Sequence, residues 1–100
     1  MKEFKENDII SLKLVSGEEV IGKFKSKTSD TTTIEKALVM MHGPQGLAFG
    51  TFFATANSDN GIDFLNDKLM SIGLTNNKVK EEYARVTSSI AQAPKKTIIT

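Results

Sequence analysis

The chain has 100 residues, of which 39% are hydrophobic and 25% charged, and its formal net charge at pH 7 is +1. This composition is typical of one globular domain with a modest core and excludes a disordered or fibrous chain. A charge so close to neutral excludes a general attraction to nucleic acid or acidic membranes. With no cysteine, disulfides, thiol nucleophiles and cysteine-ligated zinc are excluded. No apolar run approaches the ~18 residues that cross a bilayer, so we expect a soluble, cytoplasmic protein with no membrane partner.

The segment from Asp8 to Lys25 alternates apolar and polar residues with the period of a β-strand. The turn sequence SGEE at 16–19 interrupts this pattern, which predicts a β-hairpin with one buried face. Two glycines of the hairpin are given different roles. Gly17 is expected to supply the positive φ of the turn, whereas Gly22, inside the second strand, lets a small barrel bend sharply.

Four further strands are predicted after this hairpin, at 31–41 (TTTIEKALVMM), 47–56 (LAFGTFFATA), 62–65 (IDFL) and 68–74 (KLMSIGL). The segment 47–56 is the most hydrophobic part of the chain, and we expect it to be buried on much of both faces. The sequence NSDNG at 57–61, which follows it, is a strong turn signal.

After Thr75 the apolar residues recur with the spacing of an α-helix. The residues of this stripe are Val79, Tyr83, Val86 and Ile90. They predict one amphipathic helix over 76–92 that packs on the sheet, with Asn76 or Asn77 as its N-cap and Pro94 marking its end. Glu81 and Arg85 are expected to pair one turn apart.

Other residues could suggest catalytic or metal chemistry, but simpler explanations are favoured. The one histidine, His42, lies in the turn sequence MHGPQG, where an exposed side chain is expected rather than a catalytic one. Asp59, Asp63 and Asp67 are four residues apart, but turn chemistry explains them better than a calcium loop, whose glycine and glutamate positions are not matched. We therefore expect no enzyme activity and no metal or other cofactor.

The segment from Ile10 to Ala37 resembles the first signature motif of the Sm and Sm-like (LSm, Hfq) family. That motif has alternating apolar residues, then two glycines at fixed spacing, a polar loop and a strand that ends apolar-Glu-polar-Ala. The residues that match it are Leu14, Gly17, Gly22, Phe24, Ile34, Glu35 and Ala37. The segment 64–72 is similar in shape to the second motif, with Asn66 where the family has glycine.

The resemblance implies a mainly β fold, a small and strongly bent five-stranded antiparallel Sm-like barrel (SH3-like), here with one C-terminal α-helix. A single domain would span 1–93, with the barrel at about 8–74 and the helix at about 76–92, followed by a tail at 94–100. Edge strands of such barrels pair between copies, which implies a homo-oligomeric ring of about five to seven subunits. The divergent motifs look similar to members encoded by marine bacteriophages, which would place the protein in the host cytoplasm.

Sm-like proteins bind single-stranded RNA with Asp, an aromatic residue and Asn in the loop after the second strand, and with Arg-Gly of the second motif. Here that loop has Asp30 but no aromatic residue, and Leu65 occupies the Arg position. Because stacking on such groups contributes ~1–3 kcal/mol per base, their loss implies weak or atypical RNA binding. The residues to which the resemblance assigns this binding are Lys25, Lys27, Thr28, Asp30, Thr32, Asn66 and Lys68.

Two alternatives stay open at this point. The lysines beside the loop are also explained as charges that keep an exposed strand edge from aggregating. The protein would then be a ring-forming structural or protein-interaction module without RNA binding. Its helix or its C-terminal tail, which contains the sequence TIIT, would be the docking element.

Overall fold

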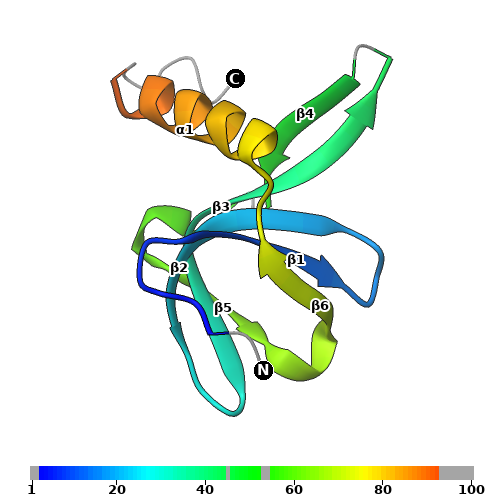
Figure 1. The fold of residues 1–100 in the computed structure, drawn as a ribbon, viewed down its shortest axis with the longest axis vertical. Helices are drawn as coiled ribbons and strands as arrows, with labels where there is room; N and C mark the ends of the chain where they lie inside the picture. Colours follow the sequence, from blue (N-terminus) through cyan, green and yellow to red (C-terminus); the bar gives the residue numbers. More distant parts are fainter. Residues whose placement is uncertain (1–2, 45, 53–54, 93–100) are drawn as a thin grey trace.

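The computed structural model describes residues 3–44, 46–52 and 55–92. Within these residues it is mainly β, with six strands and one C-terminal α-helix (Figure 1). The strands are β1 (Ile9–Leu14), β2 (Glu19–Lys27), β3 (Thr31–Gly43), β4 (Gly46–Thr51), β5 (Ile62–Leu65) and β6 (Leu69–Leu74). The short 3-10 helices are η1 (Ser58–Asn60) and η2 (Asn66–Lys68), and the α-helix is α1 (Asn77–Gln92). The predicted small, mainly β fold with a single C-terminal helix is confirmed.

The strands form one antiparallel sheet in the order β4-β3-β2-β1-β6, and β5 pairs with β3 on the same edge as β4. β3 can hold both partners because it has 13 residues: β5 lies opposite 31–34 and β4 opposite 38–43. The implied five-stranded barrel therefore has six strands here, because the fourth strand is divided by a segment that includes η1. No backbone pairing joins β5 to β6 in the described part of the chain, so the curved sheet is open along this seam.

The core lies on the inner face of the curved sheet, and Phe4, Phe52, Leu69 and Ile72 pack against its margin. Its buried members are Ile10, Leu12, Leu14, Val20, Phe24, Ile34, Ala37, Ile62 and Phe64. The alternation read from the hairpin is therefore confirmed. Ile21, on the opposite face of β2, is also buried, and it lines a hollow together with Val79 of α1. The outer face of β2 is therefore covered at Ile21, whereas Glu19 and Lys25 of the same strand are exposed.

The two hairpin glycines have the roles predicted for them. Gly17 has a φ of 103°, which an L side chain rarely adopts. Gly22 lies where the register of β2 against β3 shifts, opposite a bulge in which Lys36 has a φ of 54°. A Cβ at Gly22 would lie 2.6 Å from Ile34 Cδ1 and 3.1 Å from the Glu35 carbonyl oxygen. Glycine is required because the backbone of β3 approaches so closely at the bend.

One burial prediction was wrong. The segment 47–56 was expected to be buried on much of both faces, yet Ala48 and Thr51 are exposed. β4 and the end of β3 extend away from the rest of the sheet as a hairpin (Figure 1). Ala48 and Thr51 lie on opposite faces of β4, so neither face of this strand is fully covered. Residues 53 and 54 of the predicted strand lie outside the described residues.

The helix α1 lies across the open end of the barrel beside this hairpin (Figure 1). Asn76 is its N-cap, because the Asn76 Oδ1 accepts a hydrogen bond of 2.9 Å from the Val79 N–H. Arg85 pairs with Glu82 rather than with the predicted Glu81. No helix in the described residues is long and apolar enough to cross a membrane. The side chain of Ile90, Pro94 and the tail lie outside what the structure describes.

Candidate functional site

Four of the residues predicted to bind RNA, Thr28, Asp30, Thr32 and Asn66, come together where the β2–β3 turn meets η2. The Thr32 hydroxyl donates a hydrogen bond of 2.6 Å to the Asn66 Oδ1, across 34 positions of sequence. The Asn66 Nδ2 donates one of 2.9 Å to the Thr28 carbonyl oxygen. The backbone N–H of Asn66 donates to the Asp30 carbonyl oxygen at 2.8 Å. Asn66 therefore joins the two segments at three points.

The turn itself is closed by Thr28. Its Oγ1 accepts hydrogen bonds from the backbone N–H groups of Asp30, at 3.1 Å, and Thr31, at 3.0 Å. This pattern lets a hydroxyl side chain stabilise a tight turn. The side chains of Thr28, Thr32 and Asn66 thus bond to one another or to the backbone and hold the turn. A base could use only the donor and acceptor positions that these bonds leave.

The three lysines of the predicted site differ in their surroundings. Lys25 Nζ lies 3.1 Å from a Glu6 carboxylate oxygen and 3.7 Å from one of Glu35. The hydrogen bond to Glu6, together with the charges of Glu6 and Glu35, raises the pKa of Lys25. Lys27 and Lys68 form no ion pair with any residue that the structure describes. Only these two lysines of the site leave their full charge available to an anion.

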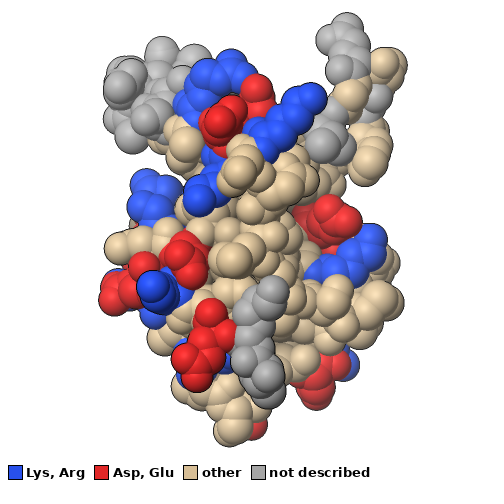
Figure 2. All heavy atoms as spheres, viewed as in Figure 1, with Lys and Arg blue, Asp and Glu red and all other residues tan. Residues whose placement is uncertain are grey.

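The surface beside the turn offers little for a base to stack on. The paired rings that the structure describes are Phe4 with Phe24, Phe49 with Tyr83, and Phe52 with Phe64. None of these rings belongs to the β2–β3 turn. Leu65, which stands at the Arg position of the second motif, is exposed. Figure 2 shows basic and acidic side chains interspersed over one face of the molecule, without a continuous patch of either sign.

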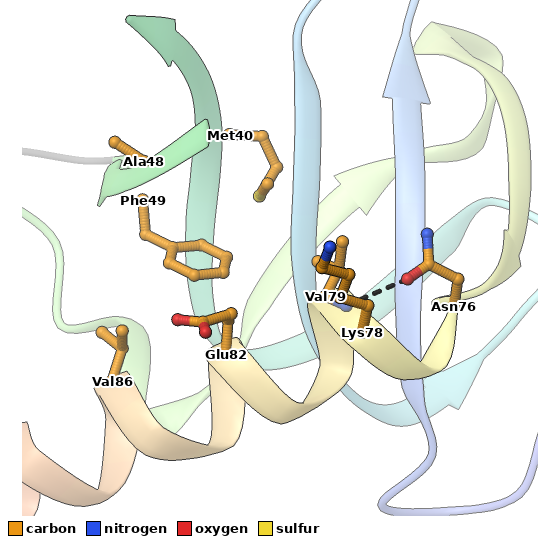
Figure 3. Close-up of a pocket in the computed structure, with 8 residues that line it drawn as sticks. All are labelled: Met40, Ala48, Phe49, Asn76, Lys78, Val79, Glu82 and Val86. Atoms are coloured by element: carbon orange, nitrogen blue, oxygen red, sulfur yellow. Dashed lines mark hydrogen bonds between the residues drawn. The ribbon is translucent and has the colours of Figure 1, made fainter. Parts of the chain in front are cut away.

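A second feature, which the sequence did not reveal, is an open hollow of about 620 Å³ between α1 and the β3–β4 hairpin (Figure 3). Its apolar lining comes from Met40, Ala48, Phe49, Val79 and Val86. The stripe of α1 was expected to cover the core, and Tyr83 does so, being 1% exposed. Because the hairpin diverges from α1, the neighbouring residues of the stripe line a hollow instead.

The outer edges of β5 and β6 form a third feature. Each is an end of the hydrogen-bonded sheet, and neither has a backbone partner on its outer side within the described residues. Three large apolar side chains next to these edges are exposed: Leu65 by 54%, Met70 by 63% and Leu74 by 57%. The alternation of the strands did not indicate this exposure, since it identifies a face of a strand and says nothing about its edge.

No group of three or more histidine, aspartate or glutamate side chains in the described part of the chain could hold a metal ion. His42 is exposed near the tip of the β3–β4 hairpin. In the comparisons with known proteins, no family model matches the chain, and no curated protein matches it in sequence.

Proposed function

We propose that this protein is a ring-forming module of the Sm-like kind, in which β6 of one copy pairs with the β5 edge of the next. The open seam between β5 and β6 is the observation that carries this proposal. Unpaired strand edges promote association between chains unless they are short, charged or covered. β6 carries exposed Met70 and Leu74 and no charged residue, and β5 carries exposed Leu65 beside a single charge, Asp63.

The geometry of one chain suits a ring better than a two-fold dimer. The two open edges belong to different strands, which η2 links directly. Pairing one edge with the other is a head-to-tail contact, and such contacts close into rings when the rotation between copies allows it. The resemblance to Sm-like proteins in 10–37 implies the same arrangement, with about five to seven copies.

Lysines placed on the β6 edge are expected to prevent this assembly. The native mass of the unaltered protein should be a multiple of the chain mass, 10.9 kDa. The double variant Met70→Lys/Leu74→Lys should give the mass of one chain, because each charge would have to be desolvated in the interface. Native mass spectrometry and light scattering measure both.

Met41→Lys is the matched control, because Met41 is 47% exposed but lies in the β3–β4 hairpin, which extends away from β5 and β6 (Figure 1). It should leave the native mass unchanged. A single-chain mass for the unaltered protein would contradict the proposal. A native mass that is still a multiple of the chain mass in the double variant Met70→Lys/Leu74→Lys would also contradict it.

The second candidate function is RNA binding by the assembled ring. The observation that favours it is that Lys27 and Lys68, on the two segments joined by Asn66, form no ion pair within the described residues. A ring would repeat this pair in every subunit, so contacts that are weak in one chain would add along a single strand. Charge would dominate such binding, because the turn supplies no stacking group.

Oligo(U) and oligo(A) are expected to bind at low salt with little preference between them. Lys27→Glu/Lys68→Glu should weaken the binding of both RNAs. If each lysine contacts one phosphate, the plot of log binding constant against log salt concentration should become less steep by ~1.4 or more. Fluorescence anisotropy at two salt concentrations measures this. Lys78→Glu/Lys80→Glu, on α1, is the control for the same change in net charge. Failure of the unaltered protein to bind at low salt, or an equal loss in the control, would exclude RNA as the ligand.

A further inference from the structure

The hollow between α1 and β4 has no occupant among the described residues and is not used by the proposed assembly. Phe49 and Met40 extend into it from the hairpin, and Val79 and Val86 face it from the helix (Figure 3). β4 is the last strand in the order of the sheet, so its outer edge has no backbone partner in the described part of the chain. An occupant would therefore meet an apolar floor and an open strand edge together.

The polar groups at the hollow do not suit a small polar ligand. The Asn76 side chain accepts the hydrogen bond that caps α1, and Glu82 pairs with Arg85. Small-molecule sites depend on a few polar groups that converge on the ligand. Here Asn76 and Glu82 are already engaged, and Lys78 is the one other polar side chain of the lining. Few polar groups therefore converge on an otherwise apolar hollow, so the site favours an extended, apolar segment that adds to the strand edge.

The chain contains one segment of that chemistry close by in sequence. Residues 93–100, which lie outside the described part, read APKKTIIT. Pro94 disfavours continuation of the helix, because the residue before a proline avoids the α region. The β-branched residues that follow favour an extended strand over a helix. Ile98 and Ile99 are its two large apolar side chains.

The length of this segment matches the distance it would have to cover. α1 ends at Gln92, and at ~1.5 Å per residue the axis from there back to Val86 measures ~9 Å and to Val79 ~20 Å. Ile98 and Ile99 follow Pro94 by four and five residues, a reach of ~13–17 Å back along α1 for an extended chain. A segment that turns back at Pro94 therefore brings both isoleucines level with the apolar lining.

We propose that the hollow is the docking site of the chain's own C-terminus, in which Ile98 packs between α1 and β4 of the same chain, while Ile99, next to it in the extended segment, points to the other face. The segment adds along the open edge of β4 and covers Phe49, Val79 and Val86. The same site would be closed to any other extended segment while the C-terminus occupies it.

Because the chain has no cysteine, an engineered pair can test this contact in the full-length protein. With Val86→Cys/Ile98→Cys, mild oxidation is expected to give a disulfide within one chain, seen by non-reducing electrophoresis and peptide mass spectrometry. Val15→Cys/Ile98→Cys, which pairs the tail with an exposed turn, should form several times less. Equal yields in the two pairs would overturn the proposal, as would a disulfide that joins two chains, which would place the tail in another copy.

A second measurement uses the chain without cysteine. Ile98→Asp/Ile99→Asp is expected to shift the backbone amide resonances of Phe49, Val79 and Val86. Ile98→Val/Ile99→Val, which keeps the β-branched apolar character, should leave those resonances close to their original positions. Unchanged resonances in the aspartate variant would overturn the proposal.

Discussion

Replacing Tyr83 with alanine is expected to lower the free energy of unfolding by about 3–5 kcal/mol, the loss typical of a large buried aromatic side chain. Tyr83 is 1% exposed and lies at the junction of α1 with the sheet. Its hydroxyl donates a hydrogen bond of 2.8 Å to the Lys36 carbonyl oxygen, and its ring centroid lies 6.2 Å from that of Phe49 in an edge arrangement. Urea denaturation followed by circular dichroism measures the change.

Tyr83→Phe separates the ring from the hydroxyl. It keeps the contact with Phe49 and removes the hydrogen bond to Lys36, so we expect a smaller loss of about 0.5–1.5 kcal/mol. Both variants are best compared in the Met70→Lys/Leu74→Lys background, so that assembly does not add to the measured stability. If Tyr83→Ala and Tyr83→Phe lowered the free energy of unfolding by the same small amount, the aromatic ring of Tyr83 would not be what holds α1 on the sheet.

Replacing Gly22 with alanine is expected to lower the free energy of unfolding by about 1–3 kcal/mol, the usual effect of overpacking a core. The added Cβ would lie 2.6 Å from Ile34 Cδ1, and Ile34 is fully buried and has little room to move. The Glu35 carbonyl oxygen, at 3.1 Å, belongs to the backbone of the bulge and would also have to shift. Thermal and urea denaturation measure the loss.

Gly73→Ala is the matched control, because Gly73 also lies inside a strand but a Cβ there would have no neighbouring atom within 4 Å. Alanine at this position is expected to be neutral or slightly stabilising, since it restricts the unfolded chain. Equal losses at Gly22 and Gly73 would mean that the close approach at the bulge is not what requires glycine.

Features that depend on neighbours in the sequence could be predicted from it. The alternation in β1 and β2 identified the buried face because side chains alternate along a strand wherever the strand lies. The positive φ of Gly17 and the cap by Asn76 were predicted for the same reason, since a turn and a helix end involve only a few consecutive residues. The interruption between β4 and β5 was indicated by the turn sequence at 57–61.

Features that depend on contacts between distant segments could not be predicted in this way. The pairing of Asn66 with Thr32 joins residues that no local pattern connects, so this hydrogen bond could not be predicted. The exposure of Ala48 follows from a hairpin that extends away from the rest of the sheet. The sequence motif therefore located the candidate site. Which of its side chains can bind a ligand depends on the contacts that each of them makes in the folded chain.

The junction of α1 with the sheet also has a spectroscopic consequence. Tyr83 is the chain's one tyrosine, and there is no tryptophan. Burial, followed by the charges of Asp59 and Glu35, raises the pKa of its phenol above the usual ~10. The folded state therefore loses stability as the pH rises above ~10, where the phenol of an unfolded chain ionises. Tyrosinate absorbance would thus report the exposure of Tyr83, whether α1 alone leaves the sheet or the whole chain unfolds.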